Sequence, residues 1–328
     1  MFALPPEVVR YPVLFSGQAI ATIESDPKAI SFPYNDRGQK RFAKRSTGKI
    51  DRKKIDRAAR HRLRQNFPLS MPVDAKTHKP GIETASLTDV GRQRANNEDS
   101  YLYWEPDSDE DFRRKGRLAV VADGMGGYEG GQEASRLAVE TVRSVYDNAF
   151  SGDSQATLTA AFEGAHQNIQ RFAQEHPQFY GMGTTCTALS IVGSQLYFAH
   201  VGDSRLYLIR GQTITRLTRD HSYVGRLVES GIVRSEDAES HPQRHILTAA
   251  LGSGRDVTPH IPDHPVPLEE GDILLLCTDG LWGLVGDSDL ARVAQTNPPA
   301  DACQKLVSMA LERGGPDNIT VLILRVSA

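Results

Sequence analysis

The feature that most limits the fold is a run of short strand-like segments separated by tight turns. Two of them, Gln195–Val201 and Arg205–Arg210, are apolar enough to be buried. Gly193-Ser194 and Gly211-Gln212 are typical residues for two-residue turns beside these segments. Strands joined in this way pair antiparallel. The run therefore predicts antiparallel sheets.

Apolar residues recur at helical spacing in three other parts of the chain. These parts are residues 132–149, 156–176 and 300–313. Antiparallel sheets with helices packed against them make an α+β fold. Further strands are predicted at residues 100–103, 118–122, 184–192, 213–217, 272–278 and 319–326.

Acidic residues stand at the ends of several predicted strands, most of them beside glycine. A carboxylate at the tip of a buried strand is costly unless water, a partner or a cation compensates its charge. One such residue is usually a cap or a turn former. Five sites of this kind favour hard cations such as Mg²⁺ or Mn²⁺, two of which can activate a bridging water. The sites are Asn97-Glu98-Asp99, Asp123, Asp203, Asp279 and Asp317.

The motifs that contain these residues resemble a known family. Residues 84–326 resemble the metal-dependent (type 2C, PPM) protein serine/threonine phosphatases, particularly the compact bacterial members. The motifs occur in the family's order along almost the whole second part of the chain. They are TDVGRQRANNED at 88–99, VADGMGGYEGG at 121–131, GMGTTCTAL at 181–189, AHVGDSRLYLIR at 199–210, LTRDHSYV at 217–224, HPQRHILTAALG at 241–252, CTDGLW at 277–282 and GPDNIT at 315–320.

The resemblance implies both a fold and a reaction. The implied fold is a central β-sandwich of two antiparallel sheets flanked by helices on both outer faces, with the metals at one end. It occupies residues 82–328, after a basic extension and linker at 1–81 that is expected to be irregular or helical. The implied reaction is direct attack by a bridging metal-bound hydroxide on phosphoserine or phosphothreonine, with no phospho-enzyme.

The resemblance also implies a metal-binding set with two Mn²⁺ or Mg²⁺ ions and room for a third. Asp123 bridges two ions, and the carbonyl of Gly124 binds one of them. Glu98 acts through metal-bound water, and Asp99 supports that shell. The remaining ligands are Asp279 and Asp317, which complete the other site, and Asp203, which joins Asp279 at the third site.

Arg94 lies four residues before Glu98, where the family has its phosphate-binding arginine. A planar guanidinium suits this task because it can hold two phosphate oxygens. Structural alternatives stay open at three positions. Asp99 could cap a turn, Asp203 could be a hairpin residue that contacts no metal, and Arg94 could form a surface ion pair.

The sequence departs from the family at two places. Met125 stands where many eukaryotic relatives have a histidine that is assigned as general acid, and methionine cannot donate a proton. Bacterial relatives often have histidine at the position of Tyr128, whose ordinary pKa of about 10 makes it a weaker donor than histidine. Metal-bound water could serve instead. Ala249, just after the expected flap at residues 220–245, replaces an arginine that is frequent in the family.

Other candidate residues have simpler interpretations. Cys186, Cys277 and Cys303 lack the arginine six residues later that cysteine phosphatases need, so they are expected to fill the core. His221 is expected to be a structural loop histidine, with a substrate-side role as the alternative. The acidic and basic residues at 107–115 predict a solvated hairpin loop.

Charge divides the chain unevenly. Residues 1–81 carry 17 Lys and Arg against 7 Asp and Glu, and the rest of the chain is acidic. Thirteen of the cations lie between residues 37 and 64. They predict a solvated basic helix or a disordered arm, with contact to nucleic acid, an anionic membrane or an acidic partner as the alternative. Residues 1–70 are also a candidate upstream extension, since Met71 precedes the domain.

The resemblance implies phosphoproteins as substrates and a cognate serine/threonine kinase as partner, and the chain is expected to be a monomer. No apolar run of about 18 residues is present, so no membrane span is expected. Three cysteines in this length favour the cytoplasm, and nucleic acid is not expected as a partner. One alternative is a dedicated regulator of a single phosphoserine protein. Another is a non-catalytic binding module, whose mark would be missing metal ligands.

Overall fold

The computed structural model describes residues 79–126, 130–238, 241–254 and 256–327. The basic segment at 37–64, Met71 and Tyr128 lie outside the described residues, so the expectations about them stay predictions. Strand β1, Ile82–Asp89, begins at the boundary that the sequence indicates. The division into an extension and a domain itself stays a prediction.

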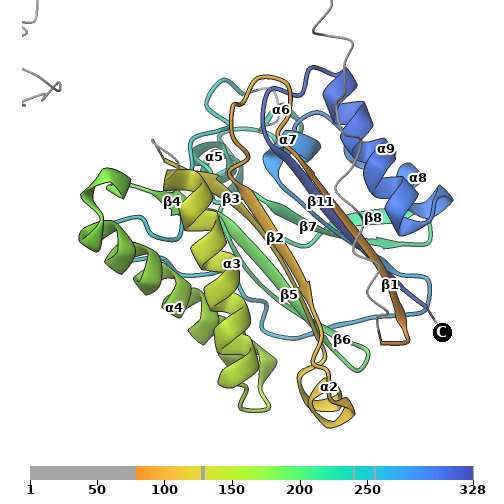
Figure 1. The fold of residues 1–328 in the computed structure, drawn as a ribbon. Helices are drawn as coiled ribbons and strands as arrows, with labels where there is room; N and C mark the ends of the chain where they lie inside the picture. The colour runs from red at the N-terminus through yellow and green to blue at the C-terminus, as the bar shows by residue number, and fades with distance from the viewer. Residues whose placement is uncertain (1–78, 127–129, 239–240, 255, 328) are drawn as a thin grey trace, which may run out of the picture. The chain divides into compact units, whose positions relative to one another are not determined.

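Two antiparallel sheets form the centre of the described region (Figure 1). The first sheet has the order β1-β11-β10-β7-β8, and the second has the order β2-β3-β5-β6-β9, with β4 paired to β3. Every pairing between these strands is antiparallel, and for β5–β6 and β7–β8 the tight turns predict it. Beyond β1, the first sheet consists of β11 (Ile319–Val326), β10 (Ile273–Cys277), β7 (Arg205–Arg210) and β8 (Thr213–Arg216). The second consists of β2 (Asp99–Trp104), β3 (Arg117–Met125), β4 (Gly183–Thr184), β5 (Cys186–Val192), β6 (Gln195–Val201) and β9 (Val266–Pro267).

Helices cover the outer face of each sheet (Figure 1). Helices α3 (Gly130–Asn148) and α4 (Ser154–Glu175) pack on the second sheet. Helices α8 (Asp287–Thr296) and α9 (Pro299–Glu312) pack on the first. The prediction of an α+β sandwich with helices on both outer faces is confirmed. The short helices of the described region are α2 (Asp109–Lys115), η1 (Pro177–Phe179), α5 (Tyr223–Glu229), α6 (Ser235–Ala238) and α7 (Asp279–Trp282).

Alternation along the strands produces three apolar layers. Successive side chains of a strand point to opposite faces of its sheet. In β11, Val321 and Ile323 pack toward α8 and α9, whereas Leu322 and Leu324 pack between the two sheets. Strand β3 divides in the same way between the inter-sheet layer and the layer under α3 and α4. The central strands β3, β5, β10 and β11 are therefore buried on two faces, which explains why they are almost continuously apolar.

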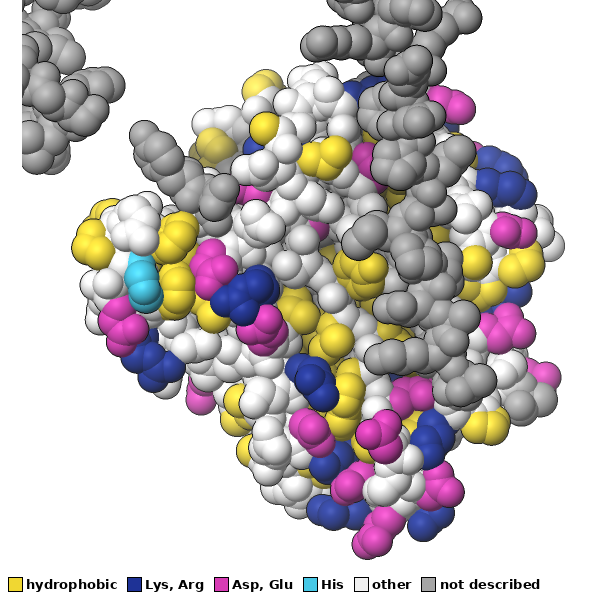
Figure 2. Space-filling view, viewed as in Figure 1, with side chains coloured by type: hydrophobic (Ala, Val, Ile, Leu, Met, Phe, Trp, Pro, Cys, Tyr) yellow, Lys and Arg dark blue, Asp and Glu magenta, His cyan; other side chains and the backbone are white. Residues whose placement is uncertain are grey.

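One local expectation was incomplete. The expected solvated hairpin connection lies between the antiparallel strands β2 and β3 and has no buried helix residue, but it also contains helix α2, Asp109–Lys115, which was not expected. Ser108 caps it by accepting a hydrogen bond from the amide of Asp111, and its acidic first turn and basic last turn complement the helix dipole. Figure 2 shows acidic and basic side chains together at the end of the molecule where Figure 1 places α2.

The cysteines agree with their expected place in the core. Cys186, Cys277 and Cys303 are all buried, and burial raises the pKa of each thiol. None of the helices in the described part of the chain combines the length and apolar character needed to cross a membrane.

Candidate functional site

The strand ends that carry acidic residues meet at one end of the sandwich. Asp123 lies near the end of β3, opposite Asp99 at the start of β2, and the register pairs these two residues directly. Strand β10 runs into Asp279, and Asp317 lies just before β11. A cavity of about 690 Å³ opens there. Residues predicted for the site that line it are Arg94, Glu98, Asp123, Gly124, Asp203, Asp279 and Asp317.

Backbone and hydroxyl contacts fix the position of Asp123. Its amide donates to Oγ1 of Thr185 at 2.9 Å, and its carbonyl accepts from the amide of Thr185 at 2.8 Å. The next residue, Gly124, is packed so closely that a Cβ there would lie 2.0 Å from the carbonyl oxygen of Gly131. The glycine of the Asp-Gly pair is therefore required by this close approach.

The loop that carries Arg94 and Glu98 is held by Asn318, which the sequence interpretation did not single out. The Nδ2 atom of Asn318 donates to the carbonyls of Val90 and Asn96, each at 2.9 Å. Its Oδ1 accepts from the amide of Glu98 at 2.8 Å. Asn318 is buried and follows Asp317 directly, so the GPDNIT motif was the available signal. This motif contributes the carboxylate of Asp317, and its Asn318 anchors the loop that carries Arg94 and Glu98.

Arg94 forms an ion pair in this structure. Its Nη2 donates to Oδ2 of Asp317 at 2.7 Å, and about half of its side chain is exposed. That hydrogen bond, with the charge of Asp317, raises the pKa of the guanidinium. This ion pair is the alternative interpretation of Arg94 given above. Arg94 also lines the cavity, so a phosphate-binding role stays a proposal.

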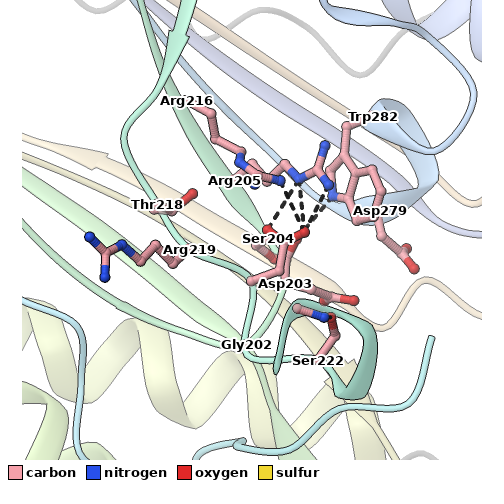
Figure 3. A network of polar contacts seen from close by, with 12 residues as sticks. Gly202, Asp203, Ser204, Arg205, Arg216, Thr218, Arg219, Ser222, Asp279 and Trp282 are labelled. Carbon is pink, nitrogen blue, oxygen red and sulfur yellow. Dashed lines mark hydrogen bonds and ion pairs between the residues drawn. The ribbon is translucent and has the colours of Figure 1, made fainter. Parts of the chain in front are cut away.

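The Asp203 loop is tied to the segment that follows Asp279 (Figure 3). The Nε1 atom of Trp282 donates to the carbonyl of Asp203 at 3.0 Å. The guanidinium of Arg205 lies 3.5 Å from the centroid of the Trp282 ring and bonds Oδ2 of Asp220 at 2.7 Å. Asp203 is only 5% exposed and lines the cavity. The turn between β6 and β7 therefore places the carboxylate of Asp203 in the site, so Asp203 is more than a hairpin residue.

Asp99 lies beneath the cavity and does not cap a turn. Its Oδ2 accepts from Oγ1 of Thr278 at 2.9 Å and from Oγ1 of Thr320 at 2.6 Å. Its Oδ1 is buried and has no hydrogen-bond partner. Thr278 and Thr320 were not identified from the sequence, because hydroxyl side chains near strand ends have many ordinary roles.

The electrostatics of the cavity favour a cation. Burial, reinforced by the charges of Asp99 and Asp279, holds the pKa of Asp123 well above its usual range. Burial raises the pKa of Asp99 to about 7. It also raises the pKa of Asp203, with Asp279 adding to the effect, and the pKa of Glu98.

Oδ1 of Asp99 is buried without a hydrogen-bond partner, and several carboxylates line the cavity next to it. This arrangement fits a hard divalent cation. Arg94 is a cationic group of the lining, which also contains His245, whose Nδ1 lies 3.4 Å from Oδ2 of Asp279. His245 was missed, although it lies in the HPQRH motif. Among the described residues, no three His, Cys, Asp or Glu side chains already form a closed metal-binding group. The structure thus gathers the predicted ligands around one cavity without drawing them into a coordination shell.

The two departures from the family pattern lie differently. Met125 lines the cavity, where its thioether has no proton to donate. Ala249 packs against the apolar layer under α3 and α4 instead. His221 donates its amide to the carbonyl of Gly202 at 2.6 Å, and its ring centroid lies 5.1 Å from that of His200. These contacts support a structural role for His221.

Comparison with known proteins agrees with this geometry. The profile of the Protein phosphatase 2C family matches residues 91–312. The serine/threonine protein phosphatase PstP of Mycobacterium tuberculosis is 37% identical over 245 residues, which are 75% of this chain but 45% of PstP. The chain therefore spans less than half the length of that relative. Protein phosphatase PhpP of Streptococcus pneumoniae is 36% identical over 251 residues, 75% of this chain and 98% of PhpP.

Solved structures agree as well. The crystal structure of the M. tuberculosis phosphatase PstP/Ppp superposes with a TM-score of 0.68 at 36% identity, covering 76% of this chain and all of that chain. The catalytic domain of PstP in complex with two manganese ions has a TM-score of 0.65 at 34% identity, covering 76% of this chain and 99% of that one. With a profile match over more than half of its length and relatives above 30% identity, the chain belongs to the protein phosphatase 2C family.

Proposed function

We propose that the chain is a metal-dependent protein phosphatase that hydrolyses phosphoserine and phosphothreonine. The observation that carries the proposal is the cavity itself, where carboxylates from separate strand ends face Arg94. Membership of the family and the activity in the names of PstP and PhpP support it. The retained carboxylates disfavour a non-catalytic binding module.

The proposed cofactor is Mn²⁺ or Mg²⁺, with two ions in the main site and room for a third. Support comes from the acidic cavity and from the two manganese ions in the catalytic domain of PstP. Bound divalent cations would supply the positive charge that activates water and neutralises phosphoryl oxygens. The residues proposed to hold them are Glu98, Asp123, the carbonyl of Gly124, Asp203, Asp279 and Asp317, with Asp99 in support.

Arg94 is proposed to orient the phosphoryl group of the substrate. Its guanidinium can present two parallel N–H groups to two phosphate oxygens. It stands on the cavity wall within reach of Asp317, and its half-exposed side chain has space to turn toward a ligand. Binding a dianionic phosphate at this point would hold the phosphorus in the cavity, which lowers the entropic part of the barrier.

Phosphorylated proteins are the proposed substrates, and a cognate serine/threonine kinase is the proposed partner. A dedicated regulatory phosphatase for one phosphoprotein would use the same cavity. Activity on a panel of unrelated phosphothreonine and phosphoserine peptides separates the two possibilities, because a dedicated enzyme would act on few of them.

The test of the proposed function is hydrolysis of p-nitrophenyl phosphate and a phosphothreonine peptide, each with Mn²⁺ and with chelator. We expect activity with Mn²⁺ and loss of it with chelator. Equal rates in the two conditions would contradict metal dependence, and no hydrolysis under either condition would contradict the phosphatase.

A further inference from the structure

Asp99 joins the two sheets at the cavity end of the sandwich. The residue belongs to β2 of the second sheet, but both side-chain partners of its Oδ2 come from the first sheet. Thr278 directly follows β10, and Thr320 lies in β11. All three residues are less than 10% exposed. Two buried hydroxyls of the first sheet therefore hydrogen-bond the same oxygen of the Asp99 carboxylate.

The hydroxyl protons in this group have only one consistent arrangement when Asp99 is ionised. A carboxylate only accepts, so Thr278 and Thr320 must each donate their single proton to Oδ2. Thr278 Oγ1 in turn accepts from the amide of Thr320 at 3.0 Å. The amide of Thr278 donates to the carbonyl of Thr320 at 3.1 Å. The two threonines thus hold each other in place while they hold Asp99.

A second set of contacts closes the group into a ring. Thr88 Oγ1 lies 2.8 Å from Thr320 Oγ1 and accepts from Nδ2 of Asn97 at 2.8 Å. Because the proton of Thr320 is committed to Asp99, Thr88 is the donor between the two hydroxyls. Oδ1 of Asn97 accepts the amide of Asp99 at 3.1 Å. Every donor in this ring has an acceptor, which makes the orientation of the carboxylate a property of the network.

The network saturates one carboxylate oxygen and leaves the other without a partner. Oδ1 of Asp99 is buried and accepts no hydrogen bond. Asp279 and Asp317 are near enough to repel it electrostatically, and both line the cavity. A buried charged oxygen without a donor is costly, so it calls for a cation or for water held by one.

We propose that Thr278 and Thr320 are positioning residues of the metal centre: their hydroxyls hold Oδ2 of Asp99 so that Oδ1 faces a divalent cation or its bound water. The inference rests on the proposed function and assigns these residues no contact with substrate. Their effect on catalysis passes through the cation affinity of the site. Outer partners of metal ligands commonly change metal affinity by about 10-fold to 100-fold when they are removed.

The direct test is Mn²⁺ binding to the metal-free full chain, measured by isothermal titration calorimetry. Thr320→Val and Thr278→Val remove one hydroxyl each at nearly constant volume, and both should weaken Mn²⁺ binding by about tenfold or more. Thr320→Ser keeps the hydroxyl and should restore affinity to near the wild-type value. With p-nitrophenyl phosphate, the variants should need more Mn²⁺ for half-maximal rate, while the KM for the phosphate ester changes little.

Thr84→Val is the matched control. Thr84 lies in the same β1–β11 pair, and its hydroxyl donates to the carbonyl of Ile323 at 3.0 Å, away from the cavity. It should lose as much fold stability as any strand threonine that loses a hydroxyl, with wild-type Mn²⁺ affinity. Thermal unfolding in chelator measures that cost for all variants. If Thr320→Val does not fold, Thr278→Val and Thr320→Ser still give the comparison.

A double-mutant cycle with Asp99→Asn separates positioning from general destabilisation. If Thr320 acts through Asp99, Thr320→Val should weaken Mn²⁺ binding no further once Asp99 is already replaced. Wild-type Mn²⁺ affinity in both valine variants, or no rescue by Thr320→Ser, would overturn the inference while leaving the proposed function intact. A wild-type chain that neither binds Mn²⁺ nor depends on it would overturn both.

Discussion

Buried carboxylates in this protein are of two kinds. Away from the cavity they have arginine partners: Glu105 pairs with Arg117 at 2.8 Å, and Asp272, only 1% exposed, pairs with Arg210 at 2.6 Å. At the cavity the neighbours of Asp123 are other carboxylates. The same fold therefore pairs carboxylates with arginines in one region and places carboxylates next to one another in the other.

The difference shows where the protein bears an electrostatic cost. Burial of a charge without compensation is unfavourable, and a scaffold that supplies arginines elsewhere could have supplied them here. At the cavity end the carboxylates are placed instead by backbone contacts, by hydroxyls such as those of Thr278 and Thr320, and by close glycine packing. That arrangement leaves negative charge for a cation from outside the chain. Four experiments test whether the two kinds of carboxylate differ in this way.

Asp279→Asn should have the largest effect. It removes one cavity charge, and we expect kcat with saturating Mn²⁺ to fall by about a thousandfold, or about 4 kcal/mol of transition-state stabilisation. Metal-free stability should hold or rise, because Asp279 repels Asp123 and Asp203. Steady-state kinetics and urea unfolding in chelator measure the two effects.

The control for this change is Asp289→Asn, a helix carboxylate paired with Arg292 and Arg313 outside the cavity. It should keep the wild-type rate. A near-normal rate in Asp279→Asn would refute the assignment of Asp279 to the metal site.

Glu105→Gln should lower stability and leave activity unchanged, the opposite of Asp279→Asn. It leaves Arg117, whose side chain is only 7% exposed, without its charged partner. Removing one member of a buried ion pair costs about 3 kcal/mol of folding free energy. Activity of the folded variant with Mn²⁺ should stay near wild type, because this pair does not line the cavity. A large loss of rate without loss of stability in urea unfolding would show that the two kinds of carboxylate are not independent.

Gly131→Ala should disturb the cavity with a smaller cost. An added Cβ would lie 2.8 Å from Cδ of Glu98 and 2.8 Å from the carbonyl carbon of Gly124, so both the carboxylate and the backbone beside it must move. We expect about a tenfold higher Mn²⁺ requirement, as for loss of a supporting contact, and about 1–2 kcal/mol of destabilisation from overpacking. Gly164→Ala in α4 is the control, since its Cβ meets Val145 at an ordinary 3.6 Å. That change should leave the Mn²⁺ requirement unchanged and stabilise the helix.

The pH dependence of metal-free stability should show the smallest effect. Burial raises the pKa of Asp99 to about 7, above the value of about 4 in an unfolded chain. Between these values the folded state binds more protons, so the stability from this group is full below about pH 4 and is lost as pH rises toward 7. The Tm measured in chelator should therefore decrease more between pH 5.5 and pH 7.5 for the wild-type chain than for Asp99→Asn. Equal changes in the two proteins would contradict a raised pKa.

Much of the site could be predicted because its residues lie in short motifs at strand ends. Asp123, Asp203, Asp279 and Asp317 each interrupt an apolar pattern in a way that local structure alone does not explain. Strand β1 was not predicted, since its Thr and Ser residues alternate only weakly with apolar ones. Helix α8 was also missed. Its apolar face is recognisable only against the first sheet.

Four other residues of the site lie in the same motifs, but the sequence does not show what they contact: Asn318, His245, Thr278 and Thr320. Each is an ordinary polar residue whose importance comes from a partner far along the chain. The hydroxyl of Thr320 reaches Asp99 across 221 positions, and Asn318 reaches Asn96 across 222. Hydrogen bonds depend on distances of a few tenths of an ångström, and sequence spacing carries no information at that scale.

Local patterns in the sequence are sufficient for the α+β class and for the place of the carboxylates at strand ends, and the resemblance of the motifs to a family implies the sandwich. These follow from periodicity and motifs, which are local and additive along the chain. Which carboxylates have cationic partners, and which oxygen of Asp99 has no hydrogen-bond partner, is known only from the folded protein. Those outcomes depend on how two sheets meet, because burial and charge compensation are properties of the assembled environment and not of any segment alone.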